Sequence, residues 1–170
     1  MPDSRAALFK QRPAELEVIL PEPDHCFRWY EHDYPYALAR WNHHPEFEIH
    51  LIRQGSGKLV AGDYIGAFGA GHVALIGPDL PHDWIGDLAP GEYLSGRDVV
   101  LQFDGAALLA LRGTLPELGE LQHLFANARR GLEFTGATAV NAARLLEDIG
   151  SAQGLERLIL FLQLINTLLK

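Results

Sequence analysis

Histidine and carboxylate side chains gather in one short part of the chain, between residues 41 and 84. Residues two apart in a β-strand point to the same face of the sheet. Among the polar residues of the segment 41–50, Asn42, His44, Glu48 and His50 share that spacing. If their common side is the interior of a barrel, imidazole, carboxylate and amide groups converge there. Two imidazoles and one carboxylate suit a divalent transition metal.

A further imidazole can come from His82, which follows the turn-rich segment 77–81. We therefore expect a metal such as Zn, Ni or Fe, if one is bound, to touch His44, Glu48 and His82, with His50 as a further candidate ligand. Trp41 and Trp84 could stack on a ring of a bound molecule or simply pack against the protein. The predicted ligand-binding residues are Trp41, Asn42, His44, Glu48, His50, His82 and Trp84. Three arginines could clamp an anionic effector, but we expect them at the surface: Arg40, Arg53 and Arg97.

The elements that position these residues are short runs, either apolar throughout or alternating between apolar and polar residues. Glycine- and proline-rich turns separate the runs. The runs span residues 15–20, 27–30, 37–42, 47–52, 58–61, 72–76, 83–85 and 93–103. Many short strands with such punctuation are typical of a β-sandwich or barrel. We expect a mainly β sensing domain over residues 1–104, with no helix longer than three turns between residues 40 and 100.

The pattern changes near Gly105, where apolar residues begin to recur with the period of a helix. This predicts about three helices in a segment 105–170, near 117–130, 136–149 and 154–169. The third is apolar around most of its circumference, so it must be buried on more than one side. We expect a homodimer through this helix, by way of Leu158, Phe161, Leu162, Ile165 and part of Leu164 or Leu168. The alternative is that the helix packs only against the barrel and the other helices of its own chain.

Charge and composition exclude several function classes. The chain has 14 Lys and Arg against 22 Asp and Glu, a formal net charge of −8 at pH 7. Such a surface repels phosphates, so we expect no nucleic-acid binding by this chain alone. Polar residues interrupt the longest apolar stretch, so we expect no membrane span. Cys26 is the only cysteine, which excludes an internal disulfide and favours the cytoplasm.

The spacing of the polar residues resembles the first conserved motif of the cupins. His44, Glu48 and Gly55 match most of the pattern His-x-His-x3-Glu-x6-Gly, and Gly71 and His82 resemble the second motif. Asn42 stands where metal-binding cupins carry their first histidine, and its neutral amide oxygen is a weak ligand for these metals. A bound metal and a metal-free polar pocket are therefore both open.

A longer stretch is similar to the N-terminal sensing domain of AraC-type bacterial transcription regulators. The similarity covers about residues 37–170, and it is strongest in the segments 77–84, 128–136 and 154–158. It implies a cupin-type double-stranded β-helix barrel, a small-molecule effector in that barrel, and a helical dimerisation unit. It also implies a C-terminal helix-turn-helix domain that binds DNA and is absent from this sequence.

Two function classes follow from these observations. The first is the effector-sensing and dimerisation part of a regulator, without enzymatic activity. The second is a metal-dependent cupin enzyme of the isomerase or dioxygenase type, which needs a complete ligand set and an open coordination position. The asparagine at position 42, the helical tail and the end of the sequence in mid-pattern at Lys170 favour the sensor.

Overall fold

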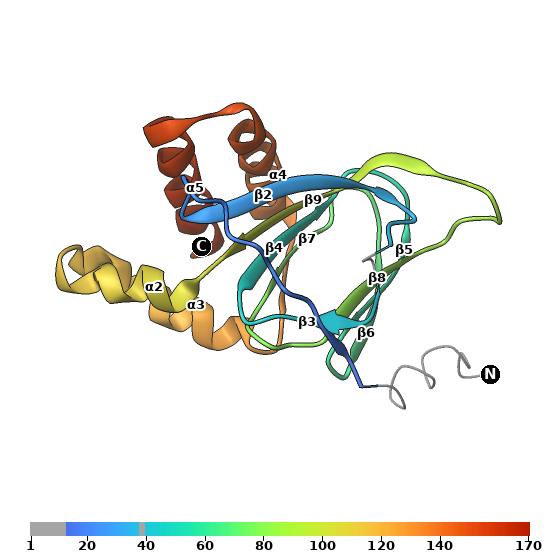
Figure 1. The fold of residues 1–170 in the computed structure, drawn as a ribbon, viewed down its shortest axis with the longest axis horizontal. Coiled ribbons are helices and arrows are strands. Elements are labelled where there is room, and N and C mark those ends of the chain that lie inside the picture. Colours follow the sequence, from blue (N-terminus) through green and yellow to red (C-terminus); the bar gives the residue numbers. More distant parts are fainter. Residues whose placement is uncertain (1–12, 38–39) are drawn as a thin grey trace.

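The computed structural model describes residues 13–37 and 40–170, and its strands form two five-stranded sheets (Figure 1). The first sheet contains, in spatial order, β1 (Glu15–Leu16), β3 (Asn42–His43), β8 (His82–Gly86), β5 (Gly57–Ala61) and β6 (Tyr64–Phe68). The second contains β10 (Leu132–Phe134), β7 (Val73–Ile76), β4 (Phe47–Ile52), β9 (Leu94–Phe103) and β2 (Phe27–Tyr34). The predicted mainly β, cupin-like architecture with C-terminal helices is confirmed.

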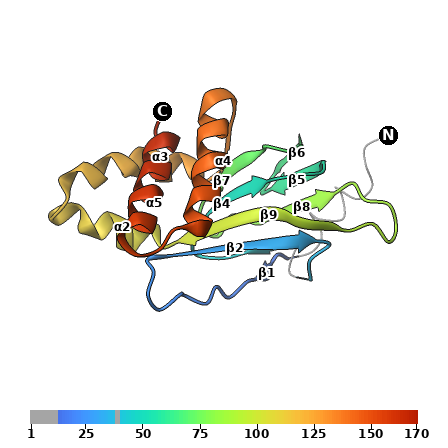
Figure 2. The same cartoon turned by 90° about the horizontal axis from the view of Figure 1, so that it is seen from above.

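Helices follow the last long strand. They are α2 (Gly105–Ala110), the 3-10 turns η1 (Leu111–Gly113) and η2 (Pro116–Glu120), α3 (Leu121–Ala128), α4 (Gly136–Ser151) and α5 (Gly154–Leu168). Helices α4 and α5 lie side by side, and α4 contacts β2, β7 and β9 of the second sheet (Figure 2). No described helix is both long and apolar enough to cross a membrane.

The helical segment differs from the prediction at its start. The expected helix at 117–130 is divided into η2 and α3, and α2 comes before both. The helix α2 is too short to show a period, but Asp104 caps it. One carboxylate oxygen of Asp104 accepts hydrogen bonds from the backbone nitrogens of Ala106 (2.9 Å) and Ala107 (3.0 Å). The helices predicted at 136–149 and 154–169 begin at the expected residues.

Two strands lie outside the predicted runs. Strand β6 closes a hairpin with β5, and β10 pairs antiparallel with β7, with Leu132 opposite Leu75 and Phe134 opposite Val73. The segment after Gly105 therefore also contributes to the second sheet. The expected run 37–42 falls partly on residues 38 and 39, outside the described residues, and its described strand is β3.

Strand β4 is buried on both faces, and alternation along it separates two cores. Phe47, Ile49 and Leu51 join an apolar cluster with α4 and α5 on the outer face of the second sheet. Ile52 belongs to a second cluster on the inner face, together with Leu59 and Trp84. The intervening polar residues of β4 share the inner face with Ile52, because the side-chain period of a strand is two.

Helix α5 contributes its buried face to the outer cluster. Phe161, Leu164, Ile165 and Leu168 are all buried within the single chain. The ring of Phe161 stacks on Phe27 with centroids 4.6 Å apart. The prediction that Phe161, Ile165 and part of Leu164 or Leu168 meet a second copy is therefore wrong, since the core of the same chain already covers all four residues. The exposed apolar residues of α5 are Leu155, Ile159 and Leu162.

Candidate functional site

Two neighbouring strands of the second sheet carry polar side chains on their inner face. Glu48 and His50 come from β4, and Asp98 and Gln102 come from β9. Register brings them together, because Glu48 lies opposite Gln102, and Asp98 lies opposite Ile52, the next inward-facing residue after His50. All four are buried, so each needs a partner inside the protein.

Glu48 is the centre of this group. Its Oε2 lies 3.1 Å from His44 Nε2 and accepts a hydrogen bond of 2.9 Å from Gln102 Nε2. Its Oε1 lies 2.9 Å from His50 Nδ1 and 3.7 Å from His82 Nε2. Burial acts to raise the pKa of Glu48, but the nearby His82 imidazole and hydrogen bonds from His44 and His50 hold it well below its usual value.

Backbone carbonyls orient the imidazoles of His44 and His82. The Nδ1 of His82 lies 2.8 Å from the carbonyl oxygen of Leu80, and that of His44 lies 3.2 Å from the carbonyl of Glu46. Because a carbonyl only accepts, each Nδ1 donates its proton and each Nε2 is directed at Glu48. Metal-ligating histidines commonly hold their second ring nitrogen in this way. Ligand atoms of His44, Glu48 and His82 all lie within 4.8 Å of one another, so this buried cluster could hold a metal.

His50 has a different role from these two histidines. Its Nδ1 faces Glu48 at 2.9 Å and its Nε2 faces Asp98 Oδ1 at 3.1 Å, so both ring nitrogens lie against carboxylates. Burial opposes a charge on the ring, but hydrogen bonds to Asp98 and Glu48 raise the pKa of His50 to about 9. A doubly protonated imidazole has no lone pair for a metal. His50 therefore neutralises carboxylates.

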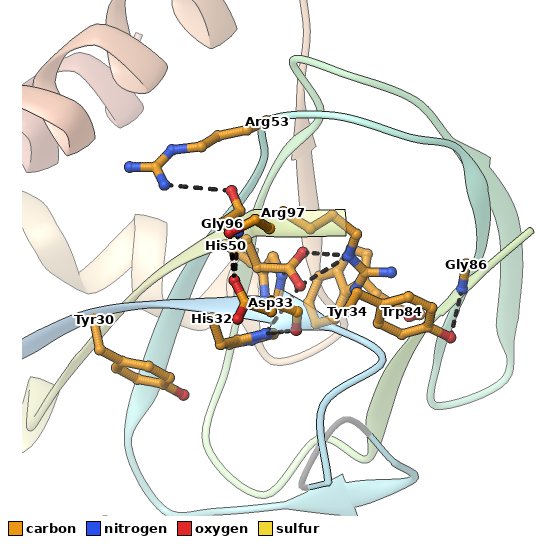
Figure 3. Close-up of polar contacts among 12 residues, drawn as sticks. Tyr30, His32, Asp33, Tyr34, His50, Arg53, Trp84, Gly86, Gly96 and Arg97 are labelled. Carbon is orange, nitrogen blue, oxygen red and sulfur yellow. Dashed lines mark hydrogen bonds and ion pairs between the residues drawn. The ribbon is translucent and has the colours of Figure 1, made fainter. Parts of the chain in front are cut away.

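Arg97 lies in the interior, contrary to the surface position expected for it. It is 1% exposed, and its Nε donates to both carboxylate oxygens of Asp98, at 3.0 and 2.9 Å. Its guanidinium lies 3.6 Å from the ring centroid of Tyr34 (Figure 3). The register of β2 and β9 shifts between His32 and Tyr34, near Gly96, whose φ is 56°. Such a bulge redirects the side chains beside it.

The other two arginines of that prediction join other elements. Arg53 is partly buried and forms ion pairs with Glu31 of β2 and Glu147 of α4, at 2.5 and 2.6 Å. Arg40 is exposed and pairs with Glu15 at 2.9 Å.

Asn42 is engaged with the N-terminal part of the chain. Its Nδ2 donates to Glu17 Oε2 over 2.6 Å. Burial, with Glu48 nearby, raises the pKa of the Glu17 carboxyl. The neighbouring His43 is half-buried, and its Nδ1 lies 3.2 Å from Asp79 Oδ1 rather than near Glu48. This agrees with the opposite parity of His43 in the strand.

The polar groups surround a pocket of about 40 Å³. Trp84 forms one wall and is buried, and one face of its ring stacks on His50 with centroids 3.8 Å apart. Asn42, Glu48, His50 and His82 also line the pocket, while Trp41 and His44 are not among its described lining residues. The lining residues that the sequence did not indicate are Glu17, Tyr30, His32, Tyr36, Asp83 and Val100. Tyr30 and His32 share the alternation of β2, which is the signal that could have found them.

Comparison with known families now decides the classification. A family model described as the AraC-like ligand binding domain matches residues 26–169. The chain belongs to this family. A search of curated proteins found no significant match.

A search of the solved structures found chains of low sequence identity to this AraC-like domain. Apo ToxT K231A from Vibrio cholerae strain SCE256 gives a TM-score of 0.55 at 18% identity, covering 86% of this chain and 55% of that chain. The AraC-like transcriptional activator CuxR gives 0.46 at 12% identity, covering 84% and 47%. A Cupin 2 conserved barrel domain protein from Salinispora arenicola CNS-205 gives 0.36 at 20% identity, covering 56% and 80%. The chain thus spans little more than half of ToxT.

Proposed function

We propose that this AraC-like domain senses a small-molecule effector for a transcription regulator, and that the effector binds in the polar pocket between the sheets. The match over residues 26–169 supports a ligand-binding role. The observation that carries the proposal is that β4 and β9 contact both the pocket and the C-terminal helices. Their inner face lines the pocket, and their outer face packs against α4 and α5.

A direct connection exists between the pocket strands and α4. Arg53 follows β4, and its backbone nitrogen donates to the carbonyl of Arg97, at 2.8 Å. Its side chain donates to both carboxylate oxygens of Glu147 on α4, at 2.7 and 2.6 Å. An effector that binds one conformation of these strands more tightly than another would increase the population of that conformation. Because the strands are linked to α4, the position of the helix would change with them.

The pocket also limits how an effector can bind. Ligand sites for drug-sized molecules usually have volumes of about 300–1,000 Å³, whereas this pocket has about 40 Å³. An effector must therefore be very small, or it must displace side chains at the exposed end of the pocket, where Tyr36 and Arg40 lie. Displacement of side chains is one way in which binding and conformational change become coupled.

Native mass spectrometry of the purified domain tests this proposal. We expect wild-type protein to carry a bound small molecule, and Gln102→Leu to lose it, because this change removes a hydrogen bond to Glu48 inside the pocket. Arg144→Gln on the exposed surface of α4 is the control and should keep the molecule. Loss from both variants, or absence of a molecule from wild type even after incubation with a bacterial metabolite extract, would contradict effector binding in this pocket.

We propose that DNA binding belongs to a part of the regulator outside this sequence. The net charge of −8 leaves this domain without a phosphate-neutralising surface. A gel-shift experiment at low salt should show no sequence-specific retention by residues 1–170. Specific retention of one DNA fragment would refute this division of roles.

A divalent metal at His44, Glu48 and His82 is a further proposal about the same site. The orientation of both Nε2 atoms toward one carboxylate supports it. A bound ion would neutralise Glu48 and offer an open position to a donor atom of the effector. The residues themselves orient both imidazoles and bury them. Burial lowers the pKa of His82. Burial also opposes a charge on His44, but the hydrogen bond to Glu48 and the charge of that carboxylate raise the pKa of His44, so metal binding there would release a proton.

Zinc titration followed by calorimetry tests the metal site. His44→Ala and His82→Ala should weaken Zn²⁺ binding by about tenfold or more. His43→Ala is the matched control, since this neighbouring histidine faces Asp79. Asn42→His should raise the affinity by adding a stronger ligand. If wild type and the His44 variant bind Zn²⁺ equally, the site is a metal-free polar network.

We also propose that the AraC-like domain is cytoplasmic and not an enzyme, in preference to a cupin isomerase or dioxygenase. The family match and the use of His50 to neutralise carboxylates support this choice. Substrate turnover by the zinc- or iron-loaded domain, lost in His44→Ala, would favour the enzyme instead.

Homodimerisation through α5 is proposed with a revised interface. Leu155, Ile159 and Leu162 are exposed and lie along one side of the helix at a spacing of four and three residues. Ile159→Glu with Leu162→Glu should give folded monomers, whereas Val18→Glu, a change of another exposed apolar residue, should not. Sedimentation velocity distinguishes the outcomes, and a monomeric wild type at tens of micromolar would refute the proposal.

A further inference from the structure

A second cavity, which we call the slot, lies between strands of the two sheets on the side away from β2. Its volume is about 590 Å³, within the usual range for small-molecule sites. One side is formed by β5 and β6, and the other by β7, β10 and the C-terminal end of α3. The polar pocket, by contrast, has about 40 Å³.

The slot continues the interior that contains the polar cluster. Ala61 of β5 is the cross-strand partner of His82, and Ile76 of β7 is the partner of Glu48. Cross-strand partners point to the same face of a sheet, so the floor of the slot begins one strand away from the cluster. The interior is therefore polar on one side and aliphatic on the other.

The floor of the slot consists of aliphatic side chains. Leu59, Ala61, Ala74 and Ile76 all line it, and each is 4% exposed or less. Such a surface binds apolar groups through the removal of water. The small side chains of Ala61 and Ala74 leave the room that larger residues would fill.

Charges at the slot oppose an anionic occupant. Its lining contains two carboxylates, Asp63 and Glu133, and one guanidinium, Arg130. Glu133 Oε1 lies 3.4 Å from His72 Nδ1, and the pKa of His72 is lowered by burial, so this imidazole adds little positive charge. The net charge of the lining is therefore negative, and a neutral molecule avoids the repulsion.

We propose that the slot is a second small-molecule site of this domain, selective for uncharged and mainly apolar ligands. This site goes beyond the proposed function, because binding in the slot requires neither the polar pocket nor DNA. The slot would bind apolar ligands, whereas the smaller pocket is lined by polar and charged side chains.

Fluorescence titration with N-phenyl-1-naphthylamine, an uncharged apolar probe that brightens in apolar sites, tests the proposal on the whole chain. We expect saturable binding of one probe per chain. Ala126→Trp should weaken it by about tenfold or more, since Ala126 is an exposed residue of α3 that lines the slot. Ala107→Trp is the matched control on the exposed surface of α2, outside the slot lining, and should leave the affinity unchanged.

Competition identifies the charge preference and separates this site from the pocket. Decan-1-ol should displace the probe at lower concentration than decanoate, which has the same chain length and a carboxylate. Gln102→Leu, the pocket variant, should leave probe binding unchanged. Equal effects of Ala126→Trp and Ala107→Trp, stronger displacement by decanoate, or probe binding that disappears as the chain dimerises would each overturn the proposal.

Discussion

The two faces of the second sheet carry opposite chemistry on the same strands. On the outer face, Phe47 of β4 and Phe103 of β9 pack with Phe161 of α5 in one apolar cluster. On the inner face, Glu48 and Asp98 are held between histidines and Arg97. Apolar burial is the main stabilising contribution in folding, whereas buried charges repay their desolvation only when every partner is present.

This comparison supports the proposal that stability and recognition are divided between the faces. The outer face can tolerate few changes of volume, because packing there determines the free energy of unfolding. The inner face keeps charged groups whose replacement by apolar residues would often be neutral or stabilising. The presence of such groups supports the proposed role in binding, and three experiments can sharpen or break the contrast.

The largest expected effect is on the outer face. Phe161→Ala should lower the free energy of unfolding by about 3–5 kcal/mol, because it removes a ring that is 1% exposed. Urea unfolding followed by circular dichroism measures the change. Ile159→Ala, on the exposed side of the same helix, should cost less than about 1 kcal/mol. Equal losses would mean that α5 is not anchored through Phe161.

The second effect concerns the inner face and depends on pH. The pKa of His50 is raised from 6.5 to about 9 in the folded protein. Its stabilising contribution is therefore complete below about pH 6.5 and disappears as the pH rises through about 9. Wild type should lose up to about 3 kcal/mol over this interval.

Urea unfolding at several pH values checks this dependence. His50→Gln should remove most of the loss of stability between pH 6.5 and 9, whereas His43→Gln, a change outside the charge network, should retain it. An unchanged pH profile in His50→Gln would show that other groups cause the loss.

The smallest effect is expected where the pocket strands meet α4. Arg53 and Glu147 are partly exposed, so solvent screens their ion pair, and Arg53→Gln should cost about 1 kcal/mol or less. A double-mutant cycle with Glu147→Gln measures the coupling between the two side chains. The coupling should exceed that of Arg144 and Asp148, a more exposed pair on α4. Equal couplings would argue against a special connection between β4 and α4.

Local spacing predicted that His44 and Glu48 share a face, and the resemblance to the second cupin motif added His82. His44, Glu48 and His82 were expected together, and the structure brings these three side chains into one cluster. The alternation of a strand is a property of the backbone, so it can be read from adjacent residues. The spacing did not indicate Arg97, because its inward position depends on the bulge near Gly96 and on contact with Tyr34.

Helix α5 shows that a periodic pattern of apolar residues can predict a helix without predicting which side of it is buried. Its apolar residues surround most of the helix, so the pattern alone did not decide which side faces the core. The structure places Phe161 and Leu164 against the second sheet and leaves Leu155 and Ile159 exposed. Strand β10 was missed for a related reason, since three residues have no measurable period and pair only because β7 lies beside them.

The sequence by itself determined the β-to-helix order, the change near Gly105 and the polar residues that share the inner face of β4. These features follow from local backbone periods of two and 3.6 residues. Only the tertiary structure decided the buried side of α5, the pairing of β10, the burial of Arg97 and the separation of the polar pocket from the slot. Each of these depends on residues far apart in the chain, whose contacts are determined by packing and desolvation of the whole domain.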